Sequence, residues 1–228
     1  MTSKTWDQPL ISVDVIAVKL DKADGNLKAF VARRANEPFK GEFALPGVLL
    51  SPHERITEAS YRALEDKVKI PNDQVRTLRD IGVSDNPDRD PRGATLSIVN
   101  LAIVDNDYVS DDEDVKLLTV AEMEEAQLPF DHSNLIRKAL VQLEALLMND
   151  KGVSKALLGE EFRTTELYGI YSQLNSLIPD IARVPDLSNL SRSLKSTSGI
   201  TSKPSESLTA SNSTGRGRPS SVWTWDAN

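Results

Sequence analysis

Between Leu10 and Asp150, apolar runs alternate with short turn-rich segments, and this alternation is the feature that most limits the folds open to the chain. "LISVDVIAVKL" predicts a strand over residues 10–20, "DKADGN" a turn, and "LKAFVARR" a second strand over residues 27–34. Further strands are predicted over 75–83 and 94–104, separated by the polar loop "SDNPDRDPRG". Strands that alternate with helices indicate an α/β domain.

Two amphipathic helices complete this pattern. The first is predicted over residues 54–69, after the strand and loop "FALPGVLL", and its apolar residues recur at helical spacing: Ile56, Ala59, Ala63, Leu64 and Val68. The second is predicted over residues 133–149, with Ser133 as its N-cap. The acidic run "DNDYVSDDEDV" between the strands and this helix is expected to be a solvated loop. The second helix closes a first domain, which we place at residues 1–149.

The pattern changes after residue 150. Three short helices are predicted over 153–158, 164–174 and 186–196, and the strands "GITSK" and "SSVWTWD" follow. Such an arrangement predicts a small winged helix-turn-helix domain over residues 150–228, with residues 204–219 as the tip of its hairpin. The Ser, Thr and Gly content is also compatible with a disordered tail. The two tryptophans of "VWTWD" favour a strand that packs.

Composition and charge exclude several kinds of protein. The chain has no cysteine, so it has no disulfide, thiol nucleophile or zinc-thiolate site, and it has only His53 and His132 as imidazoles. No apolar run approaches the roughly 20 residues of a membrane span, and "MTSKTWDQPLISVD" does not read as a secretory signal, so we expect a cytoplasmic protein. Residues 1–150 carry 18 basic and 27 acidic side chains, while residues 151–228 carry 9 and 7. A basic C-terminal module therefore follows an acidic domain, which keeps nucleic-acid binding open.

The stretch "LPGVLLSPHERITEASYRALEDKVKI" resembles the signature of the Nudix hydrolases. Glu54 matches the first Glu of that signature, seven residues follow, and Arg62, Leu64 and Ile70 match its Arg and its apolar positions. The resemblance breaks at two acidic positions, where this chain has Ala63 and Lys67, although Asp66 keeps an acid. Val48 and Lys69 stand at the two glycine positions of the signature.

The Nudix resemblance implies a metal-dependent hydrolase of nucleoside diphosphates linked to another group. Hard cations need carboxylate ligands one helical turn apart, and a lysine ammonium at such a position repels them. Because Ala63 and Lys67 replace two of the acids, we predict no enzymatic activity, no catalytic residues, no metal site and no cofactor.

Three further segments, "RRANEPFKGEFALPG", "DRDPRG" and "GRGRPSSVWTWD", resemble the Nudix-related transcriptional regulators of the NrtR type. This resemblance covers nearly the whole chain. It implies a Nudix-like α/β/α sandwich with a mixed sheet, followed by a small winged helix-turn-helix domain. It also implies a homodimer that binds a palindromic double-stranded DNA operator and senses ADP-ribose or a related nicotinamide-dinucleotide metabolite.

Candidate ligand-binding residues lie in or beside the predicted loops of the first domain. The guanidinium groups of Arg34, Arg89 and Arg92 suit bidentate contact with phosphate oxygens, and Gly93 allows a ligand to approach the backbone. Glu54 joins these candidates through its place in the signature. The alternative is that residues 88–92 form only a surface ion-pair loop, which contributes little.

The predicted recognition helix begins at Asp186, which can cap it, and ends at Lys195. The residues expected to meet base edges or phosphates on this helix and the hairpin are Ser188, Asn189, Ser191, Arg192, Lys195, Lys203, Arg216 and Arg218. Leu187, Leu190 and Leu194 are expected on its buried face.

The sequence is therefore interpreted as a DNA-binding transcriptional regulator, a repressor, with a catalytically degenerate sensor domain. Two alternatives stay open. One is an active hydrolase of ADP-ribose-like nucleotides that uses Glu54, Glu58 and Asp66. The other is a regulator of the same family that senses a sugar.

Overall fold

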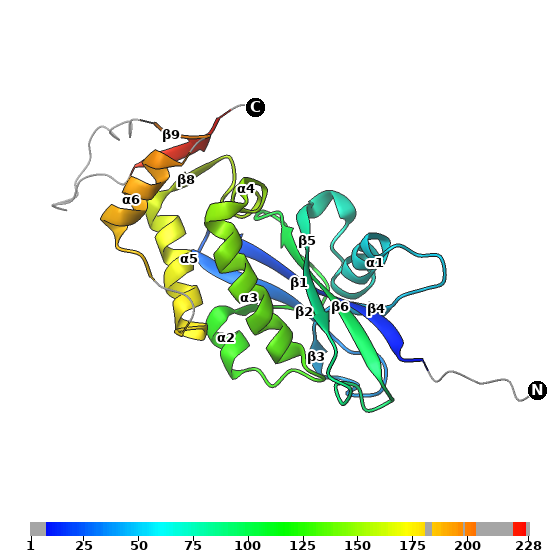
Figure 1. Ribbon diagram of the computed structural model, residues 1–228. Helices are drawn as coiled ribbons and strands as arrows, with labels where there is room; N and C mark the ends of the chain where they lie inside the picture. The colour runs from blue at the N-terminus through cyan, green and yellow to red at the C-terminus, as the bar shows by residue number, and fades with distance from the viewer. Residues whose placement is uncertain (1–7, 181–183, 198, 204–220, 227–228) are drawn as a thin grey trace, which may run out of the picture.

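The computed structural model describes residues 8–180, 184–197, 199–203 and 221–226 (Figure 1). The elements of its first part, in chain order, are β1 (Leu10–Asp21), β2 (Asn26–Arg33), β3 (Phe43–Ala44), β4 (Gly47–Leu49), α1 (Ile56–Val68), the 3-10 turn η1 (Asn72–Gln74), β5 (Val75–Ser84), β6 (Thr95–Val104), β7 (Val115–Thr119), α2 (Val120–Glu125) and α3 (His132–Asn149). The predicted strands and both amphipathic helices are present at the expected places.

A seven-stranded sheet forms the centre of this part. Its main order is β3-β2-β1-β6-β5, while β4 also pairs with β1 and β7 with β2. β1 and β6 run parallel, from Leu10 opposite Thr95 to Val18 opposite Ile103, and the other pairs are antiparallel. The sheet is therefore mixed, as predicted.

Helices cover both faces of the sheet (Figure 1). On one face, Ala59, Ala63 and Leu64 of α1 pack with Val13 and Val15 of β1 in an apolar cluster. On the other face, α2 and α3 cover a larger cluster that includes the alternate residues of the same strands. This alternation places successive strand residues on opposite faces, and it confirms the α/β/α sandwich.

The second part follows α3 after a single residue. Its elements are α4 (Lys151–Leu158), β8 (Glu161–Arg163), α5 (Thr164–Leu177), α6 (Leu187–Ser196), β9 (Ile200–Lys203) and β10 (Val222–Trp225). The last strands form an antiparallel sheet in the order β8-β10-β9. The three predicted helices and the predicted strand pair are confirmed, and the strand β8 was not predicted. The predicted hairpin tip, residues 204–219, lies outside the described residues.

One apolar core runs through both parts. The cluster that begins between the sheet and α3 continues through α4, α5 and α6 to Trp223, which is 1% exposed. The predicted boundary between residues 149 and 150 therefore coincides with the junction of two helices that share a core. Among the described residues, none of the helices has the length and apolar character that crossing a bilayer requires.

Four local expectations were wrong or incomplete. Ser133 is not the N-cap of α3, because Asp131 holds that position and the Ser133 hydroxyl donates to Ala126 O and accepts from Leu128 N. Leu187 is 42% exposed and lies outside the buried face of α6. The strand β7 and the helix α2 were not predicted, since each is too short to show a clear period.

Lys69 ends α1 in the left-handed conformation, with φ 61° and ψ 23°. A side chain in this conformation is strained, and glycine is not, which explains why the Nudix signature has glycine here. We expect Lys69→Gly to stabilise the protein by about 0.5 to 1 kcal/mol in urea denaturation. Glu65→Gly, within the exposed face of α1, is the matched control and should destabilise by about 1 kcal/mol. Destabilisation by both changes would contradict the assignment of strain to Lys69.

Candidate functional site

Glu54, just before α1, and Arg62, in the middle of that helix, bind each other. The Arg62 Nε atom lies 2.7 Å from Glu54 Oε1, its Nη2 atom lies 2.7 Å from Oε2, and the Ser51 backbone N–H donates to Oε2 at 2.9 Å. The hydrogen bonds from Arg62 and Ser51 lower the pKa of Glu54 to about 2. Glu54 is thus ionised at neutral pH, and its two oxygens are already engaged within the chain.

The other positions of the signature do not fit a divalent cation. Ala63 is fully buried in the apolar cluster under α1, while Asp66 and Lys67 are exposed on its last turns. The Glu58 carboxylate accepts from the Arg55 backbone N–H at 3.0 Å, so it caps the helix. Among the described residues, no group of three or more His, Cys, Asp or Glu side chains could hold a metal.

Arg34 and Arg92 form a pair of partly exposed cations. Burial lowers the pKa of Arg34, and the positive charge of Arg92 lowers it further, so Arg92 acts on Arg34 electrostatically. Arg92 is 52% exposed, and both oxygens of Asp90 accept from it, at 3.0 and 2.7 Å. Arg34 Nε donates to Pro38 O at 2.7 Å. Two guanidinium groups that act on each other electrostatically suit an anion with several oxygens, such as a pyrophosphate.

Two phenylalanines stand beside this pair, and sequence reasoning missed them. The Phe39 and Phe130 rings pack edge to face with centroids 5.0 Å apart, and the Arg34 guanidinium lies 4.7 Å from the Phe130 centroid. Both residues have left-handed backbones, with φ 64° and φ 60°. Bulky residues rarely adopt this conformation, and it concentrates at binding sites. The only sequence signal was the place of Phe39 within "PFKGEFALPG".

Arg89 lies apart from the exposed pair, under the surface. Its Nη2 atom lies 2.8 Å from Asp14 Oδ2 and 2.7 Å from Asp131 Oδ1, and its Nη1 atom donates to the Ser12 hydroxyl at 3.1 Å. The side chain of Arg89 is 3% exposed, and those of both acids are 7% exposed. This geometry differs from the sequence expectation of a phosphate contact, because buried carboxylates occupy the guanidinium. It also differs from the alternative of a surface ion pair.

A polar network surrounds Asp14. Oδ2 of this acid accepts from Ser97 at 2.6 Å, and a Cβ added at Gly47 would lie 2.1 Å from Oδ1, so only glycine fits over the carboxylate. His132 Nδ1 accepts from the Leu45 backbone N–H at 3.0 Å. Burial lowers the pKa of His132, which keeps its imidazole neutral at physiological pH. These groups fix β1, β4 and α3 beneath the candidate ligand site.

Gly93 lies in the same loop as Arg92, with φ 148°, and nothing lies within 4 Å of the place that a Cβ would take. It is exposed, so a ligand held by Arg92 has open access to its backbone. The predicted ligand residues Arg34, Arg92 and Gly93 are thus compatible with one surface site, whereas Glu54 and Arg89 have partners inside the chain.

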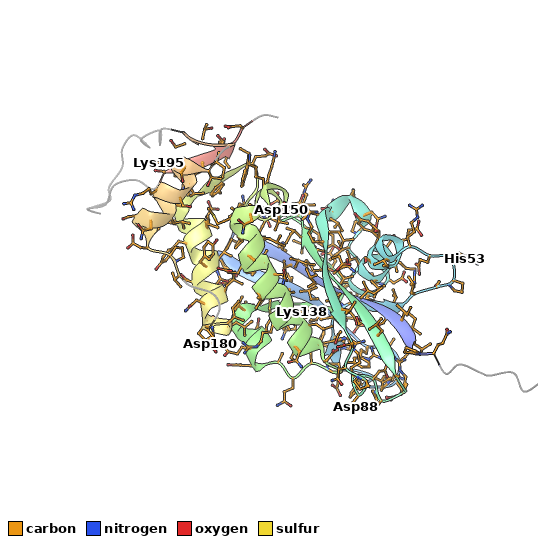
Figure 2. The ribbon with its side chains drawn as sticks, in the orientation of Figure 1. His53, Asp88, Lys138, Asp150, Asp180 and Lys195 are labelled. Carbon is orange, nitrogen blue, oxygen red and sulfur yellow. The ribbon has the colours of Figure 1, made fainter. Side chains whose placement is uncertain are left out.

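The predicted DNA-binding residues of α6 share its outer side. Asp186 accepts from the backbone N–H groups of Ser188 and Asn189, which confirms the expected N-cap. Ser188, Asn189, Arg192 and Lys195 are exposed, and Ser191 is half-buried. Arg192 Nη1 donates to Asn189 Oδ1 at 2.9 Å. Figure 2 shows Lys195 at the upper left of the molecule and Asp88, in the loop of residues 85–94, at its lower edge.

The strand pair β9–β10 is attached to the helices through its tryptophans. Trp223 Nε1 donates to Thr164 Oγ1 at 2.8 Å, and Trp225 Nε1 donates to Gly159 O at 2.8 Å. Lys203 is the last residue of β9, while Arg216 and Arg218 lie outside the described residues. The backbone of β9, which ends at Lys203, is therefore paired with a strand that is anchored in the core.

No model of a known protein family matches the chain. The ADPR-responsive transcriptional repressor NtrR of Acinetobacter baylyi is 27% identical over 176 residues, which cover 73% of this chain and 66% of the repressor. The chain thus spans slightly less than two thirds of that relative's length. An ADP-ribose pyrophosphatase of Methanocaldococcus jannaschii is 34% identical over 131 residues, which cover 57% of this chain and 72% of the pyrophosphatase.

Two solved structures of a Shewanella oneidensis protein are similar. NrtR in complex with a 27mer DNA has a TM-score of 0.67 and 23% identity, covering 95% of this chain and 93% of that chain. The NUDIX domain of NrtR in complex with ADP ribose has a TM-score of 0.52 and 25% identity, covering 63% of this chain and 94% of that chain. The first likeness shows that the fold extends over nearly the whole chain.

The mixed sheet, the altered signature on α1 and the pyrophosphatase relative define a protein built on the Nudix fold. The repressor relative and the NrtR structures narrow this class. Over most of its length, the chain is similar to the Nudix-related transcriptional regulators of the NrtR type.

Proposed function

We propose that the chain is a DNA-binding transcriptional repressor whose Nudix-like domain binds ADP-ribose or a related nicotinamide-dinucleotide metabolite. The observation that carries this proposal is the contrast between two places in the first part. At α1, Glu54 is held by Arg62 and Ala63 is buried, so no metal site remains. In and near the loop of residues 85–94, the partly exposed Arg34 and Arg92 are two cations that act on each other electrostatically. Such a protein holds a pyrophosphate and leaves it intact.

The relatives support the choice of ligand and partner. One is named as responsive to ADPR, another as an ADP-ribose pyrophosphatase, and the NrtR structures contain ADP ribose or DNA. In this proposal the two guanidinium groups bind the pyrophosphate, and the Phe39 and Phe130 rings offer an apolar face to the rest of the nucleotide.

The proposal for DNA binding rests on the second part, residues 150–228. We place α6 in the major groove, with Ser188, Asn189, Ser191 and Arg192 toward base edges. Lys195, Lys203, Arg216 and Arg218 would contact phosphates or the minor groove. Because one small module binds weakly, two copies of the chain on a palindromic operator are the proposed complex.

The test is titration of the protein with ADP-ribose by calorimetry, together with a mobility-shift assay on DNA upstream of its own gene. We expect saturable ADP-ribose binding, a DNA complex that weakens steeply with salt, and a change in DNA affinity when ADP-ribose is added. Arg92→Gln should weaken ADP-ribose binding about tenfold or more, because it removes a charged hydrogen bond. Arg76→Gln is the matched control, since Arg76 is 54% exposed and also pairs with an acid, Asp105.

A second candidate is hydrolysis of ADP-ribose, which the 34% identity to a pyrophosphatase favours. It would depend on Glu54, Glu58 and Asp66. Magnesium-dependent release of AMP at enzymatic turnover by the purified chain would support the hydrolase and would refute the proposed loss of activity. Binding of a pentose in place of ADP-ribose in the same calorimetry would instead favour the sugar-sensing alternative.

A further inference from the structure

Three separate segments meet at the buried Arg89 side chain. It contacts Asp14 and Ser12 of β1 and Asp131 at the start of α3, while Arg89 itself belongs to the loop of residues 85–94 between β5 and β6. Asp131 also accepts from the Ser84 hydroxyl at 2.5 Å. The loop is therefore joined to the first turn of α3 through a desolvated ion pair.

Asp131 is the N-cap residue of α3, but its side chain does not cap the helix. Aspartate at an N-cap ordinarily accepts from the free backbone N–H groups of its own helix. Here the carboxylate makes no such hydrogen bond, and its oxygens are used by Arg89 and Ser84. The Asp131 carboxylate thus ties the first turn of α3 to the loop and to the end of β5, in addition to the hydrogen bond that His132 accepts from the Leu45 N–H.

The next residue, Asp90, binds Arg92 of the candidate ligand site. Its side chain is 6% exposed, and both of its oxygens bind Arg92, whose own side chain is 52% exposed. Arg92 lowers the pKa of Asp90 most, and the charge of Arg89 also lowers it, so Arg89 stands within electrostatic reach. A ligand that takes the Arg92 guanidinium would leave this nearly buried carboxylate with the Arg92 backbone N–H as its hydrogen-bond donor, and with Arg34 and Arg89 as the cations that act on it.

We infer that the loop of residues 85–94 transmits ligand binding to α3 by an exchange of ion-pair partners. This inference rests on the proposed function. A ligand phosphate binds Arg92 and displaces Asp90. Asp90 then turns toward Arg89, the next residue in the chain, because a buried carboxylate that keeps only the Arg92 backbone N–H is costly without a cation. Arg89 shares its charge between more acids and holds Asp131 less firmly, so Arg89, Asp90 and Asp131 are positioning residues that the ligand does not touch.

The weaker contact between Arg89 and Asp131 affects the second part of the protein through α3. This helix runs from the loop to the junction with α4, and its Arg137 Nη1 donates to Leu177 O at the end of α5 at 2.6 Å. Since α3, α4 and α5 share one core, a shift of the first turn of α3 changes how the second part is held. Ligand and DNA are then coupled if they favour different positions of α3.

The test measures the coupling factor, which is the ratio of DNA affinities without and with saturating ADP-ribose, in the full chain. The DNA is the fragment upstream of its own gene. We expect Asp131→Asn to reduce the coupling factor at least about fivefold, while each ligand alone binds within about threefold of the wild type. Asp88→Asn makes the same chemical change at an exposed position of the same loop, and it should leave the coupling unchanged. Coupling retained in full by Asp131→Asn would overturn the inference.

A second measurement applies even if Asp131→Asn does not fold. In the wild-type protein, NMR of arginine side chains should show a shift of the Arg89 Nε–H resonance when ADP-ribose binds. An unchanged Arg89 resonance at saturation would refute the exchange of partners. If ADP-ribose or the DNA does not bind the wild type at all, the proposed function fails instead, and with it the premise of the exchange.

Discussion

Arg89→Leu is expected to destabilise the protein by about 3 to 5 kcal/mol, because it removes the cation between two buried acids. Asp14 and Asp131 are each 7% exposed in their side chains, so water cannot replace the lost guanidinium. Thermal or urea denaturation at neutral pH gives the measurement. Arg79→Leu is the matched control, since Arg79 pairs with Asp150 at 3.0 Å but is 39% exposed, and its loss should cost about 1 kcal/mol or less.

The loss of stability in Arg89→Leu should depend on pH, because Arg89 changes the pKa of a buried acid. Burial raises the pKa of Asp131, but hydrogen bonds from Arg89 and Ser84 outweigh it, and the net shift is downward from 3.8. In the wild type this acid contributes stability that is present above pH 3.8 and is lost as the pH falls through the lower folded value. Without Arg89, burial raises the pKa instead, so acid favours the folded variant. The difference in the free energy of unfolding between the wild type and Arg89→Leu should therefore become smaller as the pH falls.

Rescue distinguishes this electrostatic account from a simple packing defect. The combined variant Arg89→Leu, Asp14→Asn, Asp131→Asn removes the whole charged set, and replacement of a complete buried set is often close to neutral. We expect it to recover more than half of the stability that Arg89→Leu loses. A triple variant less stable than the single variant would show that the carboxylates do not need Arg89.

The sequence predicted the fold well because its signals are periodic. β1 is mainly apolar, interrupted by Ser12, Asp14 and Lys19, and α1 has apolar residues at helical spacing. Both lie where they were expected. β7 and α2 were missed because they contain five and six residues, and β8 because it contains three. Elements this short depend on pairing with distant strands, which no local pattern records.

The candidate site was harder to predict, because burial decides the role of each charged residue. Arg89 and Arg92 are three positions apart in "DRDPRG", yet one is buried between acids and the other is half exposed. Nothing in the loop sequence distinguishes them, since Asp14 and Asp131 are supplied by distant segments. Phe39 and Phe130 were missed for the same reason, as their contact joins residues far apart in the chain.

Trp223→Ala is expected to destabilise the protein by about 3 to 5 kcal/mol, because a large, fully buried side chain leaves a cavity. Trp223 is 1% exposed, lies at the end of the core that begins beneath the sheet, and donates to Thr164. For a chain of this size, that loss corresponds to a fall in the melting temperature of about 10 °C, measurable by calorimetry.

Under the proposed function, the same variant should lose most of its DNA affinity, because β10 directly follows the predicted wing in the sequence. Thr201→Ala, on the exposed face of β9, is the matched control and should change stability by about 0.5 kcal/mol or less. Arg216→Ala with Arg218→Ala should instead keep the stability and lower both DNA affinity and its salt dependence, since it removes charge alone. If Trp223→Ala melted earlier yet bound DNA below its melting temperature as tightly as the wild type, the strand pair would have no part in DNA binding. Together the variants separate the anchoring of the wing from its contact with phosphates.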